Sequence, residues 1–184
     1  AAFMLHVGMN IANKIGLFEE VYRLIKPGTV FGVYDVMLTG DEDLTYPVPW
    51  STTPDTSALA TQDQYIEALG QAGFDIINIR DRRGFAAEFF AETGRRMEEA
   101  GGSPPLGVHI AMGESAPAKI SNMVENIASG RVSPVEIIAS KAFTQAMANR
   151  SAAVGESFHT VSSAAISLRG FAEAVAGWFG KEAN

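Results

Sequence analysis

The residues of this chain that could do chemistry lie where its short apolar segments end. His6 is near the end of the apolar run AFMLHV (2–7), and Tyr34 and Asp35 are near the end of TVFGVYDV (29–36). An imidazole with an ordinary pKa of about 6.5 can accept a proton near neutral pH, which is the chemistry of a general base. The alternatives are a hydrogen-bonded histidine at a strand end for His6 and a loop hydrogen bond for Asp35.

Further candidate binding residues lie in the loops that follow these two segments. Asn10 either binds a ligand or caps the next helix. The segment 38–60 contains three prolines and no helical period, and loops of this length often act as lids or binding loops. Within it, Tyr46 and Trp50 offer large, rigid contact surfaces to a ligand. Their alternative role is to anchor the loop on the core.

Alternating strand and helix patterns must position these residues. The sequence predicts strands at 2–7, 29–36, 75–80 and 134–140 and helices at 14–26, 61–72, 84–99 and 116–128. Asn13 is the expected N-cap of the first helix, and Thr61 and Gln64 form a capping box at the start of the second. The order strand, helix, strand predicts a βαβ unit, whose parallel strands place their carboxyl ends at one edge of an α/β sheet.

Apolar spacing predicts which side chains are buried. Leu24 is expected on the buried face of the first helix, and Ile77 points inward from the third strand. Phe85 and Phe89 are expected on the apolar face of the helix at 84–99.

Composition excludes several classes of function. The 184 residues carry a formal net charge of −7, which argues against a nucleic-acid partner. There is no stretch of about 18 apolar residues, so no membrane partner is expected. The three histidines have no metal-ligand spacing and cysteine is absent, so no metal site is expected. The lack of cysteine also fits a cytoplasmic location.

A change in composition near residue 141 predicts two parts. Residues 1–141 contain the strand and helix pattern and all of the net charge, whereas 142–184 are Ala-rich and neutral. Apolar residues from Phe143 to Phe179 recur at alternating steps of four and three, which predicts a helical tail that packs on its own domain, on a second copy or on a partner.

The stretches MLHVGMNIANK, LFEEVYRLIKPG and TVFGVYDVM, in this order, resemble the second half of class I S-adenosylmethionine-dependent methyltransferases. The similarity is to bacterial members that act on small molecules, and it covers roughly residues 1–141. It implies a partial Rossmann-like sheet of about four strands with flanking helices. It places Leu5, His6 and Val7 beside S-adenosylmethionine, with His6 catalytic.

The same resemblance implies a small-molecule acceptor. Its expected contacts are Asn10, Tyr34, Asp35, Tyr46 and Trp50.

This sequence departs from the family pattern in three places. Asn13 replaces an Asp and Thr29 replaces a Gly, which are mild changes. The third is larger, because no G-x-G-x-G loop follows a strand, and that loop lets backbone approach the cofactor. The sequence therefore predicts the acceptor side of a methyltransferase that needs a complementing N-terminal half. The alternative is an inactive, truncated or fused α/β protein whose tail mediates self-association into a homo-oligomer.

Overall fold

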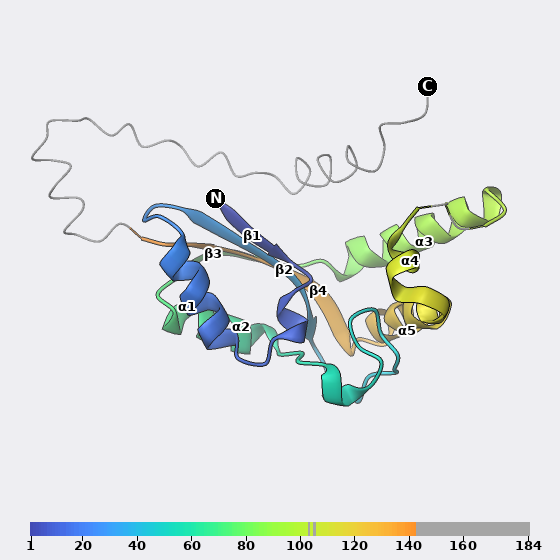
Figure 1. The fold of residues 1–184 in the computed structure, drawn as a ribbon, viewed down its shortest axis with the longest axis horizontal. Coiled ribbons are helices and arrows are strands. Elements are labelled where there is room, and N and C mark those ends of the chain that lie inside the picture. The colour runs from blue at the N-terminus through green and yellow to red at the C-terminus, as the bar shows by residue number, and fades with distance from the viewer. Residues whose placement is uncertain (103, 105, 143–184) are drawn as a thin grey trace, which may run out of the picture. The chain divides into compact units, whose positions relative to one another are not determined.

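The structure, a computed structural model, describes residues 1–102, 104 and 106–142. All of them belong to the first of the two units into which the chain divides, residues 1–143. The strands are β1 (Ala2–Leu5), β2 (Val30–Leu38), β3 (Asp75–Asp81) and β4 (Val132–Ser140) (Figure 1). The helices are α1 (Lys14–Leu24), α2 (Gln62–Gln71), α3 (Arg83–Glu99), α4 (Val108–Met112) and α5 (Ala116–Ala128).

The four strands form one mixed sheet in the order β1-β2-β4-β3. β1 and β2 are parallel, as the βαβ pattern predicted, and Leu5 lies opposite Tyr34. β4 is antiparallel to both of its neighbours, so Glu136 lies opposite Tyr34 on one side and opposite Arg80 on the other. The predicted α/β fold class is confirmed, and Leu5, Tyr34, Glu136 and Arg80 form one row across the sheet.

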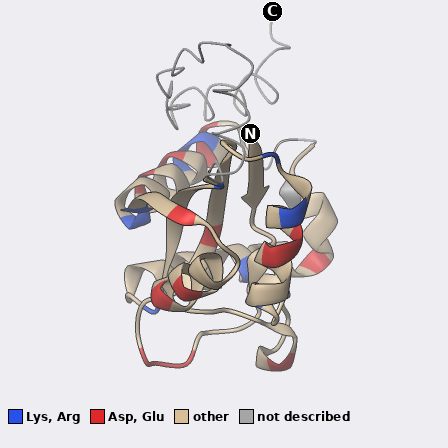
Figure 2. Cartoon of the chain, turned by 90° about the vertical axis from the view of Figure 1, so that its left-hand side faces the viewer, with Lys and Arg blue, Asp and Glu red and all other residues tan. Residues whose placement is uncertain are grey.

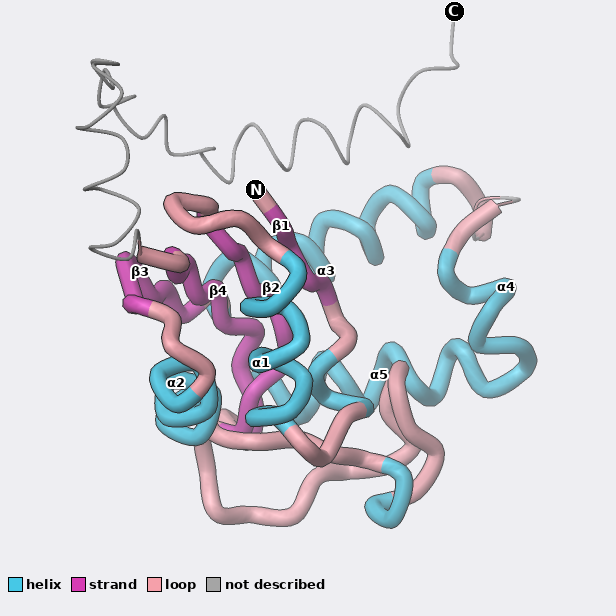
Figure 3. The backbone as a smooth tube through the Cα atoms, turned by 60° about the vertical axis from the view of Figure 1, so that its left-hand side comes forward, coloured by secondary structure: helices cyan, strands magenta, loops and turns pink. Residues whose placement is uncertain are grey.

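One face of the sheet is covered by α1 and α2 (Figure 3). Side chains alternate between the two faces of a strand, and the odd-numbered residues of β2 point toward these helices. Phe18 of α1 and Tyr65 of α2 are fully buried there, and their ring centroids are 5.8 Å apart. Burial of each large apolar side chain contributes about 1.5–3 kcal/mol, so this layer is the main core of the unit.

Both predicted helix caps are confirmed. The Asn13 side chain accepts a hydrogen bond from the Gly16 amide at 2.9 Å at the start of α1. Thr61 and Gln64 form the reciprocal capping box at the start of α2. These bonds satisfy amide groups that have no partner within the helix.

A second cluster lies on the opposite face of the sheet, where β2 ends. It contains Met9, Val36, Ala86, Met123, Ile127 and Val132. Helices α3 and α5 supply Ala86, Met123 and Ile127, so the segment between β3 and β4 covers this end of the sheet (Figures 1 and 3).

The predicted inward positions of four side chains are wrong. Leu24, the last residue of α1, is 65% exposed. A register shift between Ile76 and Asn78 moves Ile77 outward, so that Ile76 and Ile79 pack on the core instead. In α3 the buried residue is Ala86, and Phe85 and Phe89 remain 45% and 55% exposed.

β1 lies at one edge of the described sheet. Within the residues that the structure describes, β1 pairs with β2 alone. Phe3, on the face of β1 that is turned away from α1 and α2, is 69% exposed. An edge strand with an apolar side chain of this exposure is a surface that proteins ordinarily cover.

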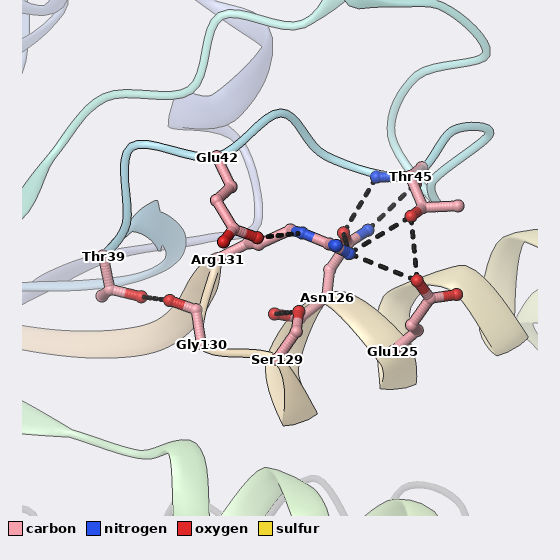
Figure 4. A network of polar contacts seen from close by, with 8 residues as sticks. All are labelled: Thr39, Glu42, Thr45, Glu125, Asn126, Ser129, Gly130 and Arg131. Atoms are coloured by element: carbon pink, nitrogen blue, oxygen red, sulfur yellow. Dashed lines mark hydrogen bonds and ion pairs between the residues drawn. The ribbon is translucent and has the colours of Figure 1, made fainter.

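The long loop after β2 is fastened to the junction between α5 and β4 (Figure 4). The fully buried Asn126 side chain accepts a hydrogen bond from the Thr45 amide and donates one to its carbonyl, both at 2.9 Å. Arg131 forms ion pairs with Glu42 at 3.3 Å and with Glu125 at 3.2 Å. The loop therefore has a defined path over this end of the sheet.

The predicted helical tail and the predicted domain 142–184 lie outside the described residues, apart from Ala142. Among the helices that the structure describes, none has the length and apolarity to cross a membrane. Figure 2 shows acidic and basic positions interspersed along the helices.

Candidate functional site

β1 reaches its carboxyl end beside the middle of β2, because Leu5 pairs with Tyr34 and β2 runs on to Leu38. Tyr34 and Asp35 therefore lie inside β2, and the prediction that they are near its end is wrong. His6 follows β1 at this edge of the sheet. The His6 amide continues the ladder by donating a hydrogen bond to the Tyr34 carbonyl at 2.8 Å. The imidazole meets the Tyr34 ring edge-on, with the ring centroids 5.3 Å apart. Ligands of open α/β sheets bind at this edge, so His6 and Tyr34 lie at the expected position of a site.

His6 has a backbone conformation that is uncommon for a residue with a side chain. Its φ angle is 52°, in the left-handed region, and it is the one residue other than glycine with positive φ among those that the structure describes. Left-handed backbone at a residue other than glycine persists when neighbouring contacts hold it. Those contacts come from Asp35, the residue after Tyr34.

Asp35 holds the loop that follows His6. Its carboxylate accepts hydrogen bonds from the Val7 amide at 2.9 Å, from the Gly8 amide at 3.0 Å and from the Tyr65 hydroxyl at 3.0 Å. The side chain is fully buried beneath the loop, toward α2. All three hydrogen-bond donors to Asp35 belong to the chain itself. The geometry therefore favours a role in holding the loop over the predicted contact of Asp35 with the methyl-accepting small molecule.

Only glycine fits at position 8, because the Asp35 carboxylate and the Tyr65 hydroxyl lie close to its backbone. A Cβ atom at this position would lie 2.4 Å from Oδ2 of Asp35 and 2.5 Å from the Tyr65 hydroxyl oxygen. Neither atom can move away without breaking the hydrogen bonds that it makes. The glycine therefore lets the backbone approach the carboxylate.

The charge of Asp35 is balanced by several neighbours. Burial raises the pKa of Asp35, and the Tyr65 hydroxyl, the two amides and the Lys14 ammonium oppose that rise. Burial and the adjacent Asp35 carboxylate raise the pKa of Tyr65, so its hydroxyl remains a donor. Burial lowers the pKa of Lys14, while the Asp35 charge opposes that change.

Lys14 joins the loop after β1 to the end of the long loop. Its Nζ donates to the carbonyl oxygens of Ile11 and Ala58, both at 2.6 Å. The Ala58 amide in turn donates to the Met9 carbonyl at 2.8 Å. Two loops distant in sequence are thereby fixed beside each other at the carboxyl edge of the sheet.

His6 has the protonation state that a base requires. His6 as a whole residue is exposed, but its ring lies against the Tyr34 ring. Because the ring loses hydration there, the pKa of His6 is lowered below its ordinary value of 6.5. The imidazole is therefore neutral at pH 7 and can accept a proton.

The other residues predicted around His6 have contrasting environments. Leu5 is half-buried in β1 and Val7 is 42% exposed beside His6. Asn10 is exposed in a 3-10 turn (Gly8–Asn10), and the cap of α1 is Asn13. The predicted contacts of Leu5 and Val7 with a cofactor, and of Asn10 with an acceptor, stay predictions.

The two aromatic residues predicted in the long loop are both half-buried. Trp50 packs against the second cluster, and its indole nitrogen donates to the Ser57 hydroxyl at 3.0 Å. This geometry favours a loop anchor for Trp50. The acceptor contacts predicted for Tyr46 and Trp50 stay predictions.

Sequence reasoning missed one residue beside Tyr34. Arg82 lies in the run RDRR, whose charges suggest a solvated strand end, yet its guanidinium is half-buried over the Phe85 ring, 4.6 Å from the centroid. Burial raises the pKa of Tyr34, and the nearby Arg82 charge opposes that rise. No local pattern marks this arrangement, because it depends on the pairing of β2, β4 and β3.

A surface cavity of about 380 Å³ lies between the start of α1, the segment 58–60 and α2. None of the predicted site residues lines it. Over the described part of the chain, no group of three His, Asp or Glu side chains could hold a metal ion.

No protein-family model and no curated protein matches this sequence. Solved structures do. Phosphoethanolamine N-methyltransferase 2 of Haemonchus contortus, in complex with phosphomonomethylethanolamine and S-adenosylhomocysteine, matches 77% of this chain with a TM-score of 0.58 and 17% identity. The chain shares its fold with part of this Rossmann-like protein. Geranyl diphosphate C-methyltransferase of Streptomyces coelicolor, in complex with Mg²⁺, geranyl diphosphate and S-adenosylhomocysteine, matches 77% with a TM-score of 0.53 and 15% identity.

The match covers only part of each solved protein. The chain spans 33% of the first of these proteins and 47% of the second. The [4+2]-cyclase SpnF also matches 78% of the chain, with a TM-score of 0.51 and 19% identity, and the chain spans 50% of its length. At these identities the agreement is one of fold, and the reaction has to be argued from the site.

Proposed function

We propose that this chain forms the acceptor side of an S-adenosylmethionine-dependent methyltransferase that acts on a small molecule. The observation that carries the proposal is His6, neutral and exposed at the carboxyl edge of a methyltransferase-type sheet. Asp35 holds the backbone of its loop, and the imidazole packs edge-on against the Tyr34 ring. Fixed position matters because methyl transfer depends mainly on the alignment of the reacting atoms.

The described residues fit one side of such a cofactor. Leu5, His6 and Val7 form the edge on which it would rest, but the sequence has no glycine-rich loop after a strand to approach it closely. When bound, S-adenosylmethionine supplies a methyl group on a positively charged sulfur. We propose that the glycine-rich part comes from a complementing N-terminal half.

In this proposal His6 accepts the proton that the acceptor oxygen or nitrogen loses as its bond to the methyl carbon forms. Tyr34 packs against the imidazole and limits its rotation. Asp35 acts through the backbone of the loop, and it is therefore a positioning residue.

The test is transfer of tritiated methyl groups from S-adenosylmethionine to a panel of small amines, alcohols and phenols. Two proteins are assayed. One is the full-length product of the gene that encodes this chain, and the other is the 184-residue chain alone. We expect transfer by a protein that contains a glycine-rich half and none by the chain alone. If the encoded protein binds the cofactor and methylates nothing in the panel, the alternative of an inactive α/β protein is favoured.

A further inference from the structure

Two complementary polar atoms are buried without a hydrogen-bond partner in the part of the chain that the structure describes. One is the donor Nε of Arg82, and the other is the acceptor Oε2 of Glu136. A buried donor or acceptor without a partner is costly, and in native proteins nearly all such groups are paired. A donor and an acceptor that lie in the same region can satisfy each other.

Strand pairing places Glu136 beside Tyr34. The two residues lie opposite each other on β4 and β2, and Arg80 of β3 lies opposite Glu136 on its other side. Side chains of directly opposite residues project from the same face of a sheet. The Glu136 side chain, which is 4% exposed, therefore lies in one row with Tyr34 and Arg80, on the face turned away from α1 and α2.

Arg82 approaches the same row from the start of α3. Its backbone amide donates to the carbonyl of Pro134, two residues before Glu136, at 2.8 Å. Its guanidinium lies over the Phe85 ring, with the guanidinium carbon 4.6 Å from the centroid. Stacking on an aromatic ring orients the planar fork of donors.

The guanidinium of Arg82 and the carboxylate of Glu136 both act on the Tyr34 hydroxyl. Burial raises the pKa of Tyr34, the charge of Arg82 opposes that rise, and the charge of Glu136 adds to it. The two groups therefore meet near one hydroxyl.

Glu136 has one oxygen to spare for a second arginine. Its Oε1 accepts from Nε of Arg80 at 2.9 Å and lies 2.8 Å from Nη2 of the same residue. A carboxylate can accept through both of its oxygens. Arg80 thus occupies Oε1 and leaves Oε2 for Arg82.

The other carboxylate near the start of α3 is already engaged. Oδ1 of Asp81 accepts from the Arg83 amide at 2.7 Å and from the Ser133 hydroxyl at 2.6 Å. Glu136 is therefore the better acceptor for the Arg82 side chain.

We propose that Oε2 of Glu136 accepts a hydrogen bond from Nε of Arg82, so that Glu136 bridges Arg80 and Arg82 and holds Arg82 at the Tyr34 hydroxyl. The Tyr34 ring packs edge-on against the His6 imidazole, with the centroids 5.3 Å apart. Through Tyr34 the bridge fixes the surface on which the proposed base rests. Glu136 and Arg82 are thus positioning residues. Their part in methyl transfer rests on the proposed function, whereas the bridge itself does not.

The first test is nuclear magnetic resonance spectroscopy of the 184-residue chain, observing the arginine Nε–H signals. A charged acceptor makes a stronger hydrogen bond than a neutral one, and it moves the donor signal downfield. Glu136→Gln should therefore move the signals of both Arg80 and Arg82 upfield. Arg80 is the internal reference, because its bond to Glu136 is present in the structure. A shift of the Arg80 signal without one of the Arg82 signal overturns the bridge.

The matched control is Glu125→Gln, which removes a carboxylate that pairs with Arg131 at 3.2 Å. It should leave the Arg80 and Arg82 signals in place, and an equal shift of the Arg82 signal in this variant would contradict the bridge. The unaltered chain covers the case in which Glu136→Gln does not fold. It should show a scalar coupling across the hydrogen bond between Nε of Arg82 and the carboxyl carbon of Glu136. A coupling for Arg80 and none for Arg82 overturns the proposal.

The second test measures the positioning role as the pKa of His6 in the same chain, followed through its ring protons. Loss of hydration lowers this pKa, so a Tyr34 ring that is no longer held should let it rise toward 6.5. We expect the rise in both Glu136→Gln and Arg82→Gln, with no change at His109. The two variants alter the local charge in opposite directions, so a rise in both excludes a simple charge effect. A His6 pKa that does not rise in Glu136→Gln overturns the positioning role.

Neither test requires methyl transfer. If both results hold and the full-length protein transfers no methyl group, the bridge stands and the proposed reaction is refuted. If methyl transfer occurs and the Arg82 signal does not respond to Glu136→Gln, the reaction stands and the bridge is refuted.

Discussion

The Gly8 amide lies 3.0 Å from Oδ2 of Asp35, at a point where the chain has no room for a Cβ atom. This contact fixes the loop whose first residue is His6. A residue on β2 thus holds the backbone of the loop that begins at the proposed base, directly after β1. The arrangement shows how a parallel strand pair can prepare a site through one buried carboxylate.

The closeness of Gly8 to Asp35 predicts the effect of adding a methyl group. Gly8→Ala should destabilise the chain by about 1–3 kcal/mol, because overpacked sites force shifts of this cost. Urea denaturation at pH 7 measures the free energy of unfolding. The control is Gly70→Ala in α2, where nothing lies within 4 Å of the new Cβ. It should be neutral or stabilising by up to about 1 kcal/mol, since alanine favours helix. Equal effects at the two positions would contradict the close contact.

The Tyr65 hydroxyl predicts a pH-dependent stability. Tyr65→Phe removes one donor to the buried Asp35 carboxylate, which should cost about 1.5–3 kcal/mol at pH 7. Burial already raises the pKa of Asp35 above its ordinary value of 3.8, so the folded state holds the proton more tightly than the unfolded state. Stability therefore falls as pH rises from 3.8 through the folded pKa. In the variant the pKa rises further, and the fall is larger and extends to higher pH.

Unfolding free energies of both proteins between pH 4 and pH 8 test this. Tyr22→Phe is the matched control, because the Tyr22 ring packs against Phe74 and its hydroxyl forms no hydrogen bond with any residue that the structure describes. A Tyr65→Phe curve parallel to that of the unaltered chain at all pH values would show that the hydroxyl does not stabilise ionised Asp35.

The missing glycine-rich loop predicts weak cofactor binding by the chain alone. Calorimetry of the 184-residue chain with S-adenosylmethionine should show no binding of micromolar strength, because backbone approach and the ribose contact both need the other half. The Streptomyces coelicolor geranyl diphosphate C-methyltransferase, which has been solved with S-adenosylhomocysteine, serves as the positive control. Micromolar binding by the chain would mean that it contains its own cofactor site.

Features of this structure that depend on local sequence were predicted better than features that depend on long-range contacts. Asn13 and the pair Thr61 and Gln64 were identified as caps because each acts within one helical turn. The position of His6 followed from the alternation of strands and helices. The inward position of Ile77 was predicted wrongly, because a register shift depends on the partner strand and is invisible in the alternation.

The contacts that build the site join residues far apart in sequence. Asp35 meets Gly8 and Tyr65 across 27 and 30 residues. Gly8, which follows an apolar run, is a signal that the backbone there approaches another group closely. Nothing in the sequence identifies that group as Asp35. Arg82 sits in a charged run that suggests exposure, and its half-buried place follows from strand pairing that the sequence does not specify.

The pH dependence of methyl transfer, with and without His6, tests the central claim most directly. The encoded protein and its His6→Gln variant are compared as kcat/KM against pH, with His109→Gln as the matched control. Loss of a general base should lower the rate about 10²–10⁴-fold. Because loss of hydration lowers the pKa of His6, the unaltered protein should lose activity only below the ordinary value of 6.5, and the His6→Gln variant should lack this acidic limb. A His6→Gln profile equal to that of the unaltered protein would contradict the assignment of His6 as the base.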